Sequence, residues 1–60
     1  MSSYCPELMT RYNSWKQAVG DLRTAYKDML SSGKGLDEQK VTEYIDKIQS
    51  AREEYIKYTQ

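Results

Sequence analysis

The sequence contains no histidine and only one cysteine, Cys5. Histidine is the commonest general base and metal ligand in proteins, and a lone cysteine forms neither an intramolecular disulfide nor, without histidine, a zinc cluster. Disulfides and structural metals are the usual supports of a chain as short as 60 residues. We therefore expect the chain to draw stability from a partner or from further copies of itself, with no bound metal or cofactor.

The same absences argue against catalysis. Cys5 has no histidine with which to form a nucleophilic pair. Carboxylates are plentiful between Glu43 and Glu54, but they alternate with lysines, as is typical of a solvated helix face. Residues 32–35, Ser-Gly-Lys-Gly, lack the upstream glycine and the preceding strand of a phosphate-binding loop. We expect no enzyme, and no catalytic, cofactor-binding or metal-binding residue.

Net charge and long apolar runs are also missing. Nine lysines and arginines balance nine aspartates and glutamates, so no net field would attract nucleic acid or an anionic membrane. No apolar run approaches the roughly 20 residues of a membrane helix. Residues 1–6 have neither the basic start nor the apolar block of a signal peptide. We expect a cytoplasmic protein whose partner is another protein, and neither a nucleic acid nor a membrane.

Apolar residues recur at alternating steps of four and three along the first half of the chain. The seam that they predict consists of Leu8, Tyr12, Trp15, Val19, Leu22, Tyr26 and Met29. Such a heptad pattern is typical of a helix that packs lengthwise on another helix. Ala18 and Ala25 lie beside the seam and are small enough to let another backbone approach. Gly20 falls on the outer face, either as a tolerated flaw in the helix or as a site of close contact with a partner.

Start and stop signals bracket this seam. Pro6 fits the first turn of a helix, where its missing N–H would have had no partner, with Ser3 or Cys5 as the capping residue. Gly33 suits the left-handed position just past a helix end. A helix over about residues 6–31 is expected.

A second row of apolar residues, with the same alternating steps of three and four, occupies the second half of the chain. It consists of Val41, Tyr44, Ile48, Ala51, Tyr55 and Tyr58. Asp37 is a good N-cap, so we expect a second helix over about residues 38–58. A turn as short as residues 32–37 makes the two helices antiparallel neighbours. The fold class expected for residues 1–60 is all-α, a single antiparallel two-helix hairpin that is completed by oligomerisation or by docking on a partner.

The second helix carries more apolar surface than one seam uses. Ile45 and Ile56 lie eleven residues apart and therefore on nearly the same helix face, about 100° round from Tyr44. Leu30 and Met9 similarly widen the apolar stripe of the first helix. An apolar surface left over after the hairpin closes is normally an interaction surface. The residues expected to bind a partner are Ile45, Ile56, Leu30, Arg52, Tyr58 and Tyr4.

The aromatic residues comprise six tyrosines and one tryptophan, with no phenylalanine. A buried tyrosine hydroxyl needs a hydrogen-bond partner, and tyrosine is enriched at protein interfaces. Two interpretations stay open for the seam tyrosines, which are Tyr12, Tyr26, Tyr44 and Tyr55. They line the rim of the hairpin with their hydroxyls in water, or they contribute to an interface. Trp15 is favoured for the hairpin core, whereas Tyr4 and Tyr58, near the chain ends, are favoured for contact with another molecule.

Two stretches resemble the small W-type head-completion proteins of tailed phages. They are residues 22–34, Leu-Arg-Thr-Ala-Tyr-Lys-Asp-Met-Leu-Ser-Ser-Gly-Lys, and residues 44–51, Tyr-Ile-Asp-Lys-Ile-Gln-Ser-Ala. In that family a helix ending in a small-residue, glycine and basic turn leads to a second helix of similar Tyr-Ile-x-x-Ile character. The family has a short β-hairpin between its helices, for which residues 32–37 leave no room. The resemblance implies a ring-forming virion connector that docks on a portal, in the host cytoplasm or the virion.

Three functional hypotheses follow. The first is a non-enzymatic interaction or assembly protein, a homo-oligomer or a hairpin that docks on a larger protein. The second is a small phage-encoded inhibitor that binds and blocks a host protein. The third is the virion connector that the resemblance implies. A nucleic-acid role is the least expected, because the basic residues are interspersed with acidic ones.

Overall fold

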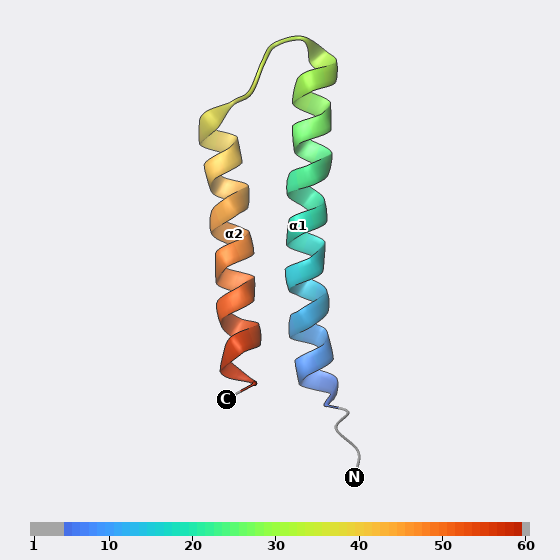
Figure 1. The fold of residues 1–60 in the computed structure, drawn as a ribbon, viewed down its shortest axis with the longest axis vertical. Coiled ribbons are helices and arrows are strands. Elements are labelled where there is room, and N and C mark those ends of the chain that lie inside the picture. The colour runs from blue at the N-terminus through green and yellow to red at the C-terminus, as the bar shows by residue number, and fades with distance from the viewer. Residues whose placement is uncertain (1–4, 60) are drawn as a thin grey trace.

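The structure, a computed structural model, describes residues 5–59 as two α-helices joined by a short turn (Figure 1). α1 spans Pro6–Ser32 and α2 spans Glu38–Lys57. The helices lie side by side and run in opposite directions, with the turn at one end of an elongated hairpin (Figure 1). The chain is an all-α helical hairpin, as the sequence predicts, and the described residues contain no strand. Each helix ends within one residue of the expected position.

Local signals account for both ends of α1. Pro6 occupies the first turn, and Cys5 before it is extended, with φ −132° and no capping hydrogen bond from its side chain. The other candidate cap, Ser3, lies outside the described residues. Gly33 follows the last turn with φ 74°, the left-handed conformation that glycine adopts without steric cost. Its N–H donates to the carbonyl of Leu30 at 3.3 Å, which satisfies one carbonyl at the helix end.

Asp37 starts α2 as an N-cap. Its carboxylate accepts a hydrogen bond from the N–H of Lys40 at 3.2 Å, which satisfies one of the free donors in the first turn. The N–H of Asp37 itself points at the sulfur of Met29, 3.5 Å away. The turn between the helices is therefore tied to the last turn of α1 as well as to the first turn of α2.

The two helices pack through a row of half-buried side chains on each, and no side chain of the described residues is fully buried. The row on α1 consists of Leu8, Arg11, Trp15, Ala18, Leu22, Ala25 and Met29. The row on α2 includes Val41, Tyr44, Ile48, Ala51 and Tyr55. Both rows advance by alternating steps of three and four, the spacing of helices that pack lengthwise. The row on α2 matches the predicted seam except for Tyr58, which is exposed.

The row on α1 corrects the predicted seam. Tyr12, Val19 and Tyr26 are expected in it but are 37%, 36% and 44% exposed. Ala18 and Ala25 lie in the half-buried row instead. The two candidate rows have the same spacing, so periodicity alone does not decide which of them faces α2. The physical reason for the observed choice is that the small side chains of Ala18 and Ala25 let the second helix approach closely.

Within residues 5–59, neither helix combines the length and the apolar character that crossing a membrane requires. The same residues contain no group of three or more cysteine, aspartate or glutamate side chains placed to hold a metal ion. Cys5 is a free, exposed thiol.

Candidate interaction surface

Three aromatic rings hold the two helices together at the end away from the turn. The ring of Tyr55 on α2 lies 5.4 Å from the ring of Trp15 and 5.7 Å from that of Tyr12, measured between centroids. Trp15 and Tyr12 meet edge to face at 6.3 Å. Tilted and edge-to-face arrangements suit the charge distribution of aromatic rings. One side of the Tyr12 ring is therefore used by the fold, while the residue as a whole stays exposed.

A polar cluster closes the same end of the hairpin. The guanidinium of Arg11 lies 5.0 Å from the centroid of the Tyr58 ring and donates to the Tyr58 hydroxyl at 3.3 Å. Its Nε lies 4.0 Å from the carboxylate of Glu54, and Lys57 Nζ lies 2.9 Å from the same carboxylate. The hydrogen bond from Lys57 and its charge lower the pKa of Glu54 below the ordinary 4.5, and the carboxylate in turn raises the pKa of Lys57.

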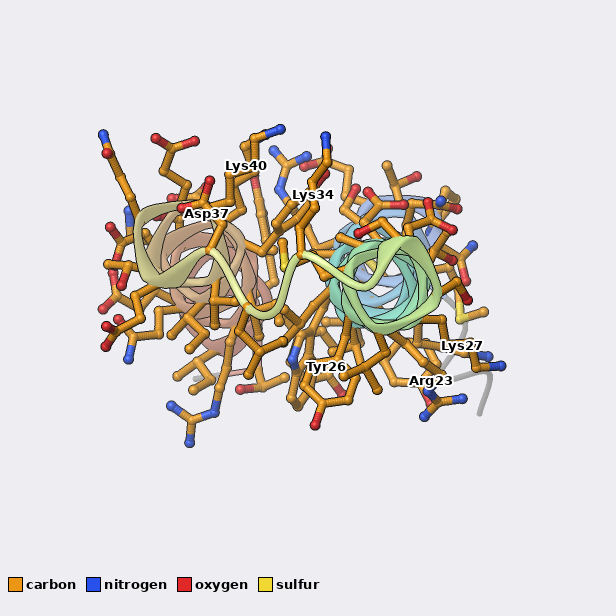
Figure 2. All side chains as sticks on the ribbon, turned by 90° about the horizontal axis from the view of Figure 1, so that it is seen from above. Arg23, Tyr26, Lys27, Lys34, Asp37 and Lys40 are labelled. Atoms are coloured by element: carbon orange, nitrogen blue, oxygen red, sulfur yellow. The ribbon has the colours of Figure 1, made fainter. Side chains whose placement is uncertain are left out.

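The exposed aromatic and apolar residues of α1 share one side of the hairpin. Figure 2, which looks along the helices from the turn, shows Tyr26 on this side together with Arg23 and Lys27. Residues seven apart lie on nearly the same helix face, so Val19 and Tyr12 follow Tyr26 along it. The side of α1 that carries the leftover apolar residues is thus also the side of these cations.

The leftover apolar residues of α2 lie on the same side. Lys40 lies on the side opposite Tyr26 (Figure 2). An α-helix has 3.6 residues per turn, which sets the angle between any two side chains about its axis. Measured from Lys40, across the half-buried row, Arg52 lies at about 120°, Ile45 at about 140° and Ile56 at about 160°. They therefore point to the side of Tyr26, so that both helices leave apolar side chains on one face.

We call this side the tyrosine face. Its members are Tyr12, Val19, Tyr26 and Leu30 from α1, and Ile45 and Ile56 from α2. Leu30, one turn beyond Tyr26, is 56% exposed, and Ile45 is 40% exposed, whereas Ile56 is half-buried. An apolar row on each of two neighbouring helices is the kind of surface on which a third helix packs.

The charges around the tyrosine face are mostly positive. Arg23 and Lys27 lie at its edge on α1 (Figure 2). By helical position Lys16 lies on the same edge, and Arg52 lies between the two isoleucines on α2. Lys16 Nζ stands 5.4 Å from the centroid of the Tyr12 ring. By helical position, Glu38 and Glu53 of α2 are the acidic residues of the described chain directed to this side or its edge.

A shallow hollow of about 370 Å³ opens on α1 beside the tyrosine face. It is lined by Trp15, Lys16, Val19, Gly20 and Arg23. Gly20 contributes to it because a glycine leaves out a side chain, and a Cβ atom built there would meet nothing within 4 Å. The hollow is therefore not filled by the hairpin's own packing.

A wider groove of about 910 Å³ lies near the turn and carries charges of both signs. Its charged lining consists of Asp21, Asp28, Asp37, Lys34, Lys40 and Lys47. Three carboxylates and three ammonium groups compensate one another there, so the groove has no bias toward a charged ligand. The tyrosine face is the better candidate for binding.

The six residues that the sequence nominates for partner binding do not all gather in one place. Ile45, Ile56, Leu30 and Arg52 are directed to the tyrosine face by their helical positions. Tyr58 belongs to the polar cluster at the end of the hairpin instead, where it is engaged by Arg11. Tyr4 lies outside the described residues.

Sequence reasoning nominates neither Val19 nor the two tyrosines of this face outright. It assigns Val19 to the hairpin seam, and it leaves Tyr12 and Tyr26 open between the rim of that seam and an interface. The signal that could have found them is the pair of alanines beside that seam, Ala18 and Ala25. Where a row of small residues runs next to a row of large ones, close helix packing favours the small row and leaves the large row at the edge.

The connection between the helices bears on the resemblance to W-type head-completion proteins. The described residues 33–37 contain no strand, so the β-hairpin of that family has no counterpart between α1 and α2. The resemblance stays a prediction. No family model matches the chain, and no curated protein or solved structure matches it either.

Proposed function

We propose that this protein is a non-enzymatic interaction protein, which acts in an assembly by burying its tyrosine face against another protein chain. The observation that carries the proposal is that both helices leave apolar side chains on the same side of the hairpin. Apolar residues scattered singly over a surface need no explanation, but apolar residues that two neighbouring helices direct to one side are typical of an interface.

The burial of the described residues supports the same proposal. A chain of 60 residues has little core of its own, and here no described side chain is fully buried. Covering a half-exposed Tyr, Leu or Ile contributes roughly 1 kcal/mol. Burying the six members of the tyrosine face against a partner would therefore contribute several kcal/mol of binding free energy. The isolated hairpin lacks this stabilisation.

A photocrosslinking experiment tests the proposal directly. A benzophenone amino acid replaces Val19 on the tyrosine face in one variant, and Gln17 on the opposite side of α1 in the matched control. After irradiation in cells that produce the protein, we expect a discrete heavier adduct from position 19 and none from position 17. Either a homodimer or a complex with a larger protein supports the proposal. Absence of an adduct at position 19, or equal adducts at both positions, would overturn it.

A further inference from the structure

We infer that the occupant of the tyrosine face is an amphipathic helix of another protein whose apolar stripe is flanked by acidic residues. The inference rests on the proposed function and names the chemistry of its partner. It follows from two features, the shape of the face between the two helices and the sign of the charges around it.

The shape favours a helix. α1 and α2 each present one lengthwise apolar row, and a third helix laid between them would complete a three-helix bundle with the usual ridge-into-groove contacts. The hollow beside Val19 lies open on α1 because Gly20 carries no side chain.

The charges favour an acidic helix. Four cations are directed to this side, Lys16, Arg23 and Lys27 along the edge of α1 and Arg52 within the apolar row of α2, against the two carboxylates of Glu38 and Glu53. Acidic residues on the flanks of the incoming helix would meet the α1 cations on one edge. Burial of Arg52 without an anion would be costly, so a carboxylate near the middle of the contact is also required.

The same charges limit how a second copy of this chain could occupy the face. Two identical tyrosine faces that meet with α1 against α1 bring the Lys16, Arg23 and Lys27 edges together, which raises the free energy of that dimer relative to a complex with an acidic helix. Faces that meet with α1 against α2 instead bring that edge toward Glu38 and Glu53, so the oligomeric state of the protein must be measured to distinguish this dimer from an acidic helix.

Two model peptides test the inference. Each is about three heptads long, with Ile and Leu at the a and d positions, and carries either Glu or Lys at the flanking e and g positions. Trp15 is the single tryptophan and lines the hollow, so its fluorescence reports binding. We expect the Glu peptide to bind at least tenfold more tightly than the Lys peptide, with an affinity that falls as salt rises.

Charge reversal supplies the matched control. Arg23→Glu combined with Arg52→Glu should reverse the preference so that the Lys peptide binds more tightly. Lys40→Glu combined with Lys47→Glu makes the same change in net charge on the opposite side and should leave the preference as it was. Arg23→Gln with Arg52→Gln is a milder pair that should abolish the preference, and circular dichroism checks that each variant is helical.

Three other outcomes would overturn the inference. The photocrosslinking experiment shows separately whether the proposed function also fails. Equal binding of both peptides, or binding of neither, excludes an acidic helix. Sedimentation as a dimer whose contact is the tyrosine face identifies a second copy as the occupant. Binding to anionic phosphatidylserine vesicles but to neither peptide identifies a membrane surface. If the peptides bind equally or not at all, or if the protein is a dimer, a specific photocrosslinked adduct at position 19 would still support the proposed function.

Discussion

The rings of Trp15 on α1 and Tyr55 on α2 pack against each other across the hairpin, with centroids 5.4 Å apart and planes tilted by 40°. The turn joins the helices at one end, and this pair joins them near the other. This contact joins residues far apart in the sequence and so closes a long loop. Its loss would increase the conformational entropy of the chain between them. The pair therefore anchors the hairpin, and through it the tyrosine face.

Replacing Trp15 with alanine should lower the free energy of unfolding by about 2 kcal/mol. This is less than the 3–5 kcal/mol of a fully buried aromatic residue, because Trp15 is only half-buried. Urea denaturation followed by circular dichroism measures the change. Lys16→Ala, on the next residue, should change stability by less than about 0.5 kcal/mol. Equal effects of the two substitutions would contradict the anchoring role of Trp15.

The cap of α2 gives a second prediction. Asp37→Ala removes the acceptor for the N–H of Lys40 and should cost about 1 kcal/mol of stability. Asp37→Asn keeps a side-chain oxygen and should retain most of the stability. Asp46→Ala, an exposed aspartate inside α2, is the matched control and should have little effect. If Asp37→Ala and Asp46→Ala melt at the same temperature, the cap has no energetic role.

Two glycines should respond in opposite ways to the same substitution. Gly33 has φ 74°, where a Cβ atom is strained, so Gly33→Ala should destabilise the hairpin by about 1 kcal/mol. Gly20 lies inside α1 with open space around it, so Gly20→Ala should stabilise the isolated chain by up to about 1 kcal/mol. Thermal unfolding of both variants checks the opposite signs. A destabilising Gly20→Ala would show that Gly20 is already in close contact, for example in an oligomer.

The pairing of Glu54 with Lys57 predicts an acid-sensitive contribution to stability. Because the folded pKa of Glu54 is lowered, its contribution is present above the unfolded pKa, near 4.5, and is lost as the pH falls through the folded pKa. Glu54→Gln should therefore lower the melting temperature slightly at pH 7 and have no effect well below the folded pKa of Glu54. A difference between the two proteins that persisted unchanged into strong acid would contradict this assignment.

The helices could be predicted from the sequence because their ends depend on neighbouring residues. Pro6 fits the first turn of α1, Gly33 ends it in a left-handed conformation, and Asp37 caps α2 through a hydrogen bond to the N–H of Lys40. Each signal acts within about one helical turn, so no tertiary information is needed. The short turn then requires antiparallel neighbours.

The positions of some residues on the candidate surface also follow from the sequence. Ile45 and Arg52 are exposed on α2 and are directed to one side by spacing alone. Tyr58 could not be placed in the same way, because its contact with Arg11 joins residues at opposite ends of the chain. No local pattern indicates that an arginine of the first helix covers an aromatic ring of the second.

The sequence by itself determined that this protein is two amphipathic helices joined by a tight turn, because propensity, capping and hydrophobic spacing act over a few residues. Only the tertiary structure decided how far the helices are rotated about their axes. α1 offers two rows of equal spacing, and the row with Ala18 and Ala25 is the half-buried one. That choice leaves Val19 and Tyr26 on the same side as Ile45, and close packing between whole helices is its physical cause.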